Sequence, residues 1–391
     1  MGDRLAFCLK EEKSMIVIEQ VLWQQTPQNV YIAGNQIIGI GTYTIDQALI
    51  THRIDGRGKR LVPGFIDGHL HPIGGGGEGG FATRTAPLTV RDIFEGGVTT
   101  VVGLLGTDGW TRTGIDLLAH IRGYAVSGIR PFLLSGSYAV PPVALTQSTG
   151  HDIVLINEVI GIGEIAINDH RSTQPTAHEL ARLASEARIA GMVKGVSGTM
   201  NVHIGDGKRG LDLLHEVIDT TDLPIGQFLP THINRSERIF EAGLAWAKRG
   251  GRIDFTTCTT ESFIAEGEIP AGEAVARALA EGIRLEQITM SSDAGASLPA
   301  FDDAGRLVRI DTGKPSSLMQ AVHDAVTHGV DFDSAIATIT RHVADAYGVS
   351  GGQIAVGERA DLLLIDDALQ IDTILANGHA IMVQKKWLIP E

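Results

Sequence analysis

Short apolar, β-branched runs alternate with longer stretches of helical periodicity from about residue 61 onward. This alternation is typical of repeated βα units, in which each strand is followed by a helix. Eight such runs occur: LVPGFIDGHLH, VTTVVGLLGTD, RPFLLSGSY, VIGIGEIAI, GMVKGVSGTMNVH, PIGQFLPTH, GRIDFTTCTT and LEQITMSSD. Eight βα units of roughly 30 residues each predict a closed, TIM-like (β/α)8 barrel of about 250 residues.

The two flanks of the chain have a different pattern. Residues 14–60 contain MIVIEQVLW, VYIAGNQIIGI and HRIDGRGKR, and residues 353–389 contain QIAVGERADLLLID and TILANGHAIMV. Short alternating strands with turn residues between them are typical of a small β domain. We therefore expect residues 1–61 and 351–391 to form one small β-sandwich domain, with the barrel spanning residues 62–350.

Composition and charge exclude several classes of partner. The chain has 391 residues, 43% of them hydrophobic, which is enough for a large core. Its net charge is -14 and it has no basic cluster, so we expect no nucleic-acid partner. The N-terminal MGDRLAFCLKEEK has charges where a secretory signal needs an apolar core, and no segment has the apolar length of a membrane span. We expect a cytoplasmic protein without membrane contact.

Candidate metal ligands lie at the ends of several apolar runs. His69 and His71 close the first run, and alternate residues of a strand point to one side, so both imidazoles can face one metal ion. In a chain with 14 histidines the pair can also arise by chance. Later runs contain or end in other candidates, namely Glu164, His203, His232 and Asp293. Barrel enzymes build their sites at the C-terminal ends of the strands, so we expect these residues to converge.

The cysteine count limits the metal ligands further. Cys8 and Cys258 are the only cysteines, too few for a disulfide framework or a thiolate zinc cluster. Any metal must therefore bind histidine and carboxylate. The alternative for His203 and His232 is that each is an ordinary polar residue at a strand end.

Several longer motifs point to a known family. PGFIDGHLH, His203, His232, the SSD that ends at Asp293 and the terminal ADLLLID occur together in this order. On these residues the chain resembles the metal-dependent amidohydrolase superfamily. A narrower set runs through most of the barrel: HPIGGGGEGG, GVTTVVGLLGTD, VIG with NDHRS, HIGDGKRGL, LPTHINR and SSDAGAS. On this set the chain resembles the isoaspartyl (β-aspartyl) dipeptidases.

The resemblance implies a metal centre with two ions. It implies that His69, His71 and Asp293 bind one ion and that His203 and His232 bind a second. Imidazole and carboxylate ligands suit zinc, so two Zn²⁺ ions per subunit are expected. Members of this family also tend to form homo-oligomers, and we expect one here.

One position departs from the family pattern. The family usually bridges its two ions with a carboxylated lysine, and the residue in register here is Glu164. The glutamate side chain is about three atoms shorter. The segment VIGIGEIAIN is one residue longer than the usual pattern, which could supply an adjustment of the backbone. We expect Glu164 to bridge the ions directly; a single-metal site, with Glu164 as an ordinary strand carboxylate, is the alternative.

Substrate-binding candidates can be chosen by charge. An isoaspartyl dipeptide offers one ammonium and two carboxylates; Glu78 suits the ammonium, while Arg171 and Arg235 suit carboxylates through bidentate hydrogen bonds. Thr107 and Ser297 match substrate-binding positions of the family, with ordinary loop polarity as the alternative. The glycines at 74–77 would let backbone amides approach a ligand. A phosphate loop is the rival interpretation, but no Gly-Lys-Ser/Thr follows the glycines.

Two residues are candidates for the chemical step. Tyr138 ends the third run, where its phenol could donate to a developing oxyanion, as the resemblance also implies; a core tyrosine is the alternative. Asp293 would take a proton from the attacking water and pass it to the leaving amine. The sequence thus predicts metal-dependent hydrolysis of isoaspartyl dipeptides. The alternatives are a dihydroorotase-like cyclic amidase, an N-acyl amino acid deacylase, or a catalytically silent scaffold.

Overall fold

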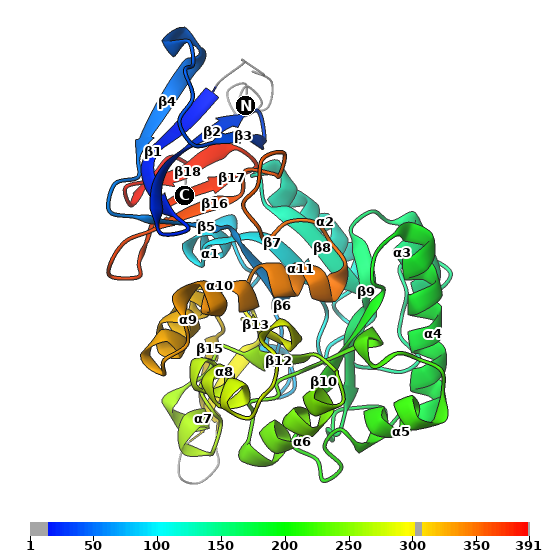
Figure 1. The fold of residues 1–391 in the computed structure, drawn as a ribbon. Helices are drawn as coiled ribbons and strands as arrows, with labels where there is room; N and C mark the ends of the chain where they lie inside the picture. Colours follow the sequence, from blue (N-terminus) through cyan, green and yellow to red (C-terminus); the bar gives the residue numbers. More distant parts are fainter. Residues whose placement is uncertain (1–14, 302–306, 390–391) are drawn as a thin grey trace. The chain divides into compact units, whose positions relative to one another are not determined.

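The computed structural model describes residues 15–301 and 307–389, which divide into two compact units (Figure 1). One unit comprises the residues up to Gly64 together with those from Gln353 on. The other comprises Phe65–Gly352 and contains every candidate site residue.

The first unit contains a nine-stranded, mostly antiparallel sheet. The first half of the chain contributes β1 (Met15–Trp23), β2 (Thr26–Ala33), β3 (Gln36–Ile40), β4 (Ile50–Asp55) and β5 (Arg60–Pro63). The C-terminal segment contributes β16 (Leu362–Ile365), β17 (Ile371–Ala376), β18 (His379–Val383) and β19 (Lys386–Trp387). β5 pairs with β16, and side chains such as Ile18, Ile32 and Leu364 share one core. The prediction that both flanks build one small β domain is confirmed.

The second unit contains eight parallel strands, one for each predicted run. They are β6 (Phe65–Leu70), β7 (Val98–Gly103), β8 (Arg130–Ser135), β9 (Val159–Ile167), β10 (Thr199–Ile204), β11 (Phe228–Thr231), β12 (Ile253–Thr256) and β13 (Ile288–Ser291). Strands β6 to β11 form one sheet in sequence order, and β12 pairs with β13. Strands β6, β7, β9 and β10 are buried along their whole length, which explains their continuous apolar sequences.

Backbone hydrogen bonds close these strands into a ring. The Asp293 amide donates to the His69 carbonyl at 2.9 Å, and the His71 amide donates to the Ala294 carbonyl at 2.7 Å, which joins the end of β13 to that of β6. The Ile233 amide donates to the Asp254 carbonyl at 3.2 Å, which joins β11 to β12. The predicted TIM-like barrel is confirmed, and its closing contacts lie beside the candidate ligands.

Helices follow the strands, and local sequence sets their ends. They are α1 (Val90–Glu95), α2 (Gly114–Val126), α3 (Thr149–Leu155), α4 (Ala177–Lys194), α5 (Asp212–Thr220), α6 (Glu237–Lys248), α7 (Glu261–Ala265), α8 (Ala271–Ala280), α9 (Ser317–Thr327), α10 (Phe332–Thr338) and α11 (Arg341–Tyr347). A capping box of Thr176 and Glu179 begins α4, and Gly195, with φ 86°, ends it. A hairpin of β14 (Ser297–Phe301) and β15 (Leu307–Thr312) follows β13.

No helix within residues 15–301 and 307–389 combines the length and the apolar character that crossing a membrane requires.

Candidate active site

The strand ends bring the predicted histidines into one buried cluster. His69 lies in β6 and His71 directly after it, His203 lies in β10, and His232 follows β11. The ring centroids of His69 and His71 are 5.6 Å apart, those of His69 and His232 are 5.2 Å apart, and those of His203 and His232 are 4.6 Å apart. None of the four residues is more than 4% exposed. Residues that are far apart in sequence thus meet at one end of the barrel.

The Glu164 carboxylate lies between the two histidine pairs. Its Oε1 is 2.6 Å from His203 Nδ1 and 3.0 Å from His232 Nε2. Its Oε2 faces the other pair, at 3.5 Å from His69 Nε2 and 3.9 Å from His71 Nε2. Each oxygen therefore faces one pair, which is how a carboxylate shared by two cations is arranged.

A bulge in β9 accompanies this placement of Glu164. Met200 pairs with Ile162 and Val202 pairs with Ile165, so Gly163 and Glu164 together oppose one residue of β10. A β-bulge bends its strand locally and changes the direction of a side chain. A Cβ on Gly163 would lie 2.9 Å from the Asn201 carbonyl oxygen, so the strands approach closely here. The bulge lies within the segment that is one residue longer than the family pattern.

Two site residues have an unusual backbone conformation. His232 has φ 63° and Asp293 has φ 56°, the left-handed region, although neither is glycine. Such a conformation costs about 1–3 kcal/mol and persists only where the surroundings enforce it. At Asp293 the hydrogen bond from its amide to His69 does so. Asp293 Oδ1 then lies 3.0 Å from His71 Nε2 and 3.6 Å from His69 Nε2.

Unpaired buried atoms indicate that this cluster fits metal. The described residues offer no hydrogen-bond partner to His69 Nε2, Glu164 Oε2 or Asp293 Oδ1, all of which are buried. Each such atom costs about 1–3 kcal/mol, a cost that a cation would remove. The ligand atoms of His69, Glu164 and His232 lie within 4.8 Å of one another, and so do those of His69, His71 and Asp293. Both groups could hold a metal ion.

Electrostatics keep the two carboxylates charged. Burial opposes ionisation of Glu164, but His69 and His203 outweigh it and hold the pKa of Glu164 well below its usual value. Burial likewise opposes ionisation of Asp293, but the nearby imidazoles of His71, His232 and His69 lower its pKa to about 2. Burial, assisted by Arg235, lowers the pKa of His232 to about 3, so its imidazole is neutral. Ionised carboxylates and a neutral imidazole are the forms that bind metal.

Tyr138 borders the same cluster. Its Oη is 2.9 Å from His203 Nδ1, and the residue is 8% exposed. Burial raises the pKa of Tyr138 well above its usual value, and the Glu164 carboxylate raises it further. The phenol therefore keeps its proton at neutral pH and is a hydrogen-bond donor.

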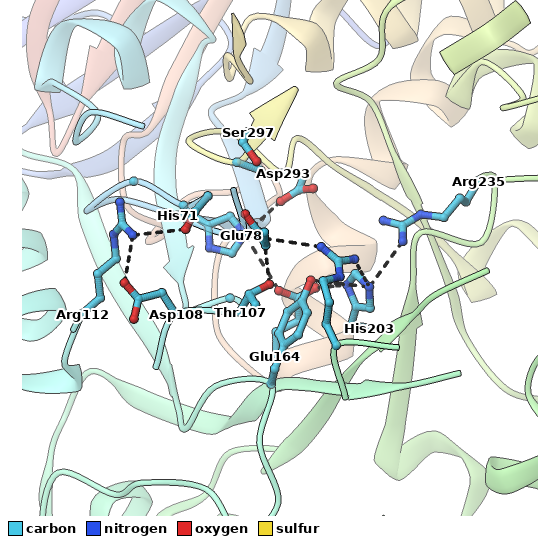
Figure 2. A pocket seen from close by; sticks show the side chains of 17 residues that line it. His71, Glu78, Thr107, Asp108, Arg112, Glu164, His203, Arg235, Asp293 and Ser297 are labelled. Atoms are coloured by element: carbon cyan, nitrogen blue, oxygen red, sulfur yellow. Dashed lines mark hydrogen bonds and ion pairs between the residues drawn. The ribbon is translucent and has the colours of Figure 1, made fainter. Parts of the chain in front are cut away.

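Together with four members of the cluster, namely His71, Glu164, His203 and Asp293, the predicted substrate-binding residues line one pocket (Figure 2). These residues are Glu78, Thr107, Arg171, Arg235 and Ser297. Thr107 Oγ1 donates to Glu78 Oε1 at 2.9 Å, and Arg171 Nη1 is 3.4 Å from the same oxygen. Arg235 Nη1 lies 3.3 Å from His203 Nε2. The pocket thus brings the Glu78 carboxylate and the guanidinium groups of Arg171 and Arg235 together with histidines of the cluster.

A buried arginine that the sequence analysis missed holds the glycine loop. Arg112 is 4% exposed and donates to the carbonyls of Ile73 at 3.2 Å and Thr85 at 3.3 Å. Its Nη1 is also 3.4 Å from Asp108 Oδ2. Gly74 in this loop has φ 79°, and a Cβ there would lie 2.4 Å from the Thr85 carbonyl oxygen, so glycine is required. The only sequence signal for Arg112 was its place four residues after Asp108.

Asp169 is a second residue that the sequence analysis missed. It lies just after β9 and accepts hydrogen bonds from Arg171, and its Oδ2 is 3.0 Å from His203 Nε2. Asp169 is the first residue of the DHRS motif, but only Arg171 of that motif was predicted to be a site residue.

Comparison with known proteins decides the family. Residues 60–386 match the sequence profile of the Amidohydrolase family. The chain belongs to this family. A β-aspartyl dipeptidase of Fervidobacterium islandicum AW-1, solved in complex with β-Asp-Leu, is 38% identical to this amidohydrolase; the match covers 96% of this chain and 99% of that one, with a TM-score of 0.88. A second structure of that enzyme is 35% identical over 96% of this chain and 99% of that one, with a TM-score of 0.87. The predicted membership in the β-aspartyl dipeptidase family is confirmed.

More distant similarities are found to one solved structure and to one sequence relative. An N-acetylglucosamine-6-phosphate deacetylase of Pasteurella multocida is 16% identical over 94% of this amidohydrolase and 99% of that chain, with a TM-score of 0.61. An adenine deaminase of Oceanobacillus iheyensis is 23% identical over 98% of this chain. The amidohydrolase spans only 59% of the length of that deaminase.

Proposed function

We propose that this amidohydrolase is a zinc-dependent hydrolase of β-aspartyl dipeptides. The charges of one pocket carry the proposal: Glu78, Arg171 and Arg235 line it together with His71, Glu164, His203 and Asp293 of the cluster. A β-aspartyl dipeptide has one ammonium and two carboxylates around its isopeptide bond, so its charges match those three side chains. The similarity to a β-aspartyl dipeptidase that was solved with β-Asp-Leu supports the same substrate class.

The cluster would hold two zinc ions per subunit. His69, His71 and Asp293 would bind one ion, His203 and His232 the other, and Glu164 would bind both. When bound, such ions act as Lewis acids that polarise a carbonyl and activate water as a nucleophile at neutral pH.

The chain's own residues would move the protons and bind the charges. The ionised carboxylate of Asp293 would accept a proton from the attacking water and deliver it to the leaving amine. The Tyr138 phenol would donate to the carbonyl oxygen as negative charge develops there. Glu78, Arg171 and Arg235 would fix the substrate by its ends, so that the isopeptide bond lies at the cluster. Because the chain has a candidate residue for each of these roles, a catalytically silent scaffold is disfavoured.

Metal analysis together with a substrate panel tests the proposal. The panel consists of β-Asp-Leu, α-Asp-Leu, dihydroorotate, N-acetyl-leucine and adenine. We expect about two equivalents of zinc and hydrolysis of β-Asp-Leu alone. Equal rates on the two dipeptides, or faster turnover of any other compound, would overturn the assignment.

Tyr138→Phe should lower kcat for β-Asp-Leu by about 10²–10³-fold, the usual effect of removing one oxyanion donor. The phenyl ring keeps the packing, so metal content and the unfolding temperature should match those of the wild type. Steady-state kinetics with metal analysis check this. A wild-type kcat would show that Tyr138 is a core tyrosine only.

Arg235→Met should lower kcat/KM for β-Asp-Leu by roughly 10–100-fold, because a hydrogen-bonded charge on the substrate loses its partner. The metal content should not change. Arg122→Met is the matched control, since Arg122 pairs with Glu158 at the surface and its side chain is 57% exposed. Equal kinetics for the Arg235 and Arg122 variants would contradict a role for Arg235 in substrate binding.

A further inference from the structure

We propose that Asp169 is a positioning residue that fixes both His203, a proposed metal ligand, and Arg171, a proposed substrate-binding residue. The inference rests on the proposed function, because it links two parts of that site. It predicts that one carboxylate controls metal affinity and substrate binding together.

The contacts of Asp169 use both of its oxygens. Oδ1 accepts from the Arg171 amide at 2.8 Å and from Arg171 Nε at 3.0 Å. Oδ2 accepts from Arg171 Nη2 at 2.7 Å and lies 3.0 Å from His203 Nε2. Arg171 Nη2 and His203 Nε2 share this one oxygen, which accounts for their separation of only 3.3 Å. Asp169 itself is 8% exposed, so water competes little for these contacts.

The contact with His203 determines which ring nitrogen is available to a cation. A carboxylate that pairs with a guanidinium is ionised and can only accept, so His203 Nε2 carries the ring hydrogen. When a cation is bound, His203 Nδ1, the atom that lies 2.6 Å from Glu164 Oε1, would then present its lone pair to that cation. An acceptor on the outer nitrogen of a metal-binding histidine fixes its tautomer and ring orientation.

The backbone around Asp169 is fixed from two adjacent strands. Asn168, with φ 56°, turns the chain directly after β9. Its Nδ2 donates to the Gly205 carbonyl at 2.5 Å, and its Oδ1 accepts from the Arg209 amide at 2.9 Å. A Cβ on Gly205 would lie 2.5 Å from the Asp169 Cβ, so this glycine leaves room for Asp169. The ends of β9 and β10 thus hold Asp169 against His203.

Asp169→Asn is the central variant, because it keeps the size of the side chain and replaces one acceptor oxygen with a donor. We expect zinc binding to the metal-free protein, measured by competition with a chelator, to weaken by about 10–100-fold. We also expect a raised KM for β-Asp-Leu. Arg171→Met should raise the KM and leave zinc affinity unchanged. The double variant should combine the zinc affinity of Asp169→Asn with the KM of Arg171→Met, because the substrate effect passes through Arg171.

Asp152→Asn is the matched control for loss of a buried carboxylate. Asp152 is fully buried and accepts from Ser135 Oγ at 2.5 Å and from the Leu145 amide at 2.8 Å, and it does not line the pocket. We expect this variant to lower the unfolding temperature without changing zinc affinity or KM.

The two readouts separate this inference from the proposed function. If the wild-type protein does not hydrolyse β-Asp-Leu, the proposed function fails, while zinc competition still tests the link between Asp169 and His203. Asp169→Asn with wild-type zinc affinity and KM would overturn the inference, whatever its unfolding temperature. Asp169→Glu covers the case in which the asparagine variant does not fold: a displaced carboxylate should also weaken zinc binding, and a wild-type affinity there would overturn the inference as well.

Discussion

Glu164→Ala should remove bound metal and measurable turnover together. The Glu164 carboxylate is the group that faces both histidine pairs, with Oε1 toward His203 and His232 and Oε2 toward His69 and His71. Without it, two cations would lie among neutral imidazoles with little compensating charge in a buried site, which is strongly unfavourable. Metal analysis after gel filtration and an assay with β-Asp-Leu measure both effects.

If Glu164 bridges the two ions, the metal centre should assemble without carbon dioxide. A carbamate must be formed on a lysine, whereas the glutamate carboxylate is encoded in the sequence. Metal-free wild-type protein should therefore regain full activity with zinc in bicarbonate-free buffer. Excess acetate or propionate added to Glu164→Ala should restore part of the metal content and turnover by filling the vacated position.

Two results would contradict the bridging role of Glu164. One is a Glu164→Ala variant that retains its metal and activity. The other is a metal-bound structure in which Glu164 lies more than about 4 Å from either ion, compared with roughly 2.0–2.2 Å for a zinc–carboxylate bond. The second result would favour a single-metal site with Glu164 as an ordinary strand carboxylate.

Asp293→Asn should lower kcat by about 10²–10⁴-fold, the usual contribution of a general acid–base group. Asparagine keeps an oxygen that can face His69 and His71 but cannot carry the proton from water to the leaving amine. We therefore expect most of the metal to remain bound while kcat falls. Asp311→Asn, at a carboxylate that pairs with Arg309 on β15, is the control. Wild-type kcat in Asp293→Asn would exclude the proton-transfer role.

The barrel could be predicted because its strands are buried on both sides. Strands of this kind have uninterrupted apolar sequences, so each run stands out against the amphipathic helices that follow. The polar residues that end these runs, such as His71 and Asp293, then fall at one end of the barrel because all parallel strands share a direction. The convergence of the site therefore follows from strand direction alone, without knowledge of any contact.

Other features depend on contacts that sequence does not encode locally. Asp169 and His203 are 34 positions apart, and their hydrogen bond exists only because β9 and β10 are neighbours in a particular register. The left-handed backbone of His232 and Asp293 could not be predicted from residue type, because histidine and aspartate adopt it more often than most residues but still in only a small fraction of cases. The length of the segment around Glu164 signalled an irregularity, but only the pairing with β10 places the bulge at Gly163 and Glu164.

The bulge in β9 also restricts how this centre can evolve. A Glu164→Lys change alone would place a side chain about three atoms longer, once carboxylated, among the four histidines. Removal of Gly163 alone would abolish the bulge that accompanies the present placement of Glu164, because Ile162 and Ile165 already pair with Met200 and Val202 on either side of it. Each single step disrupts the cluster, so exchange between the two kinds of bridge requires a substitution and a deletion together. Proteins that evolve from this chain should therefore retain Glu164 and Gly163 together.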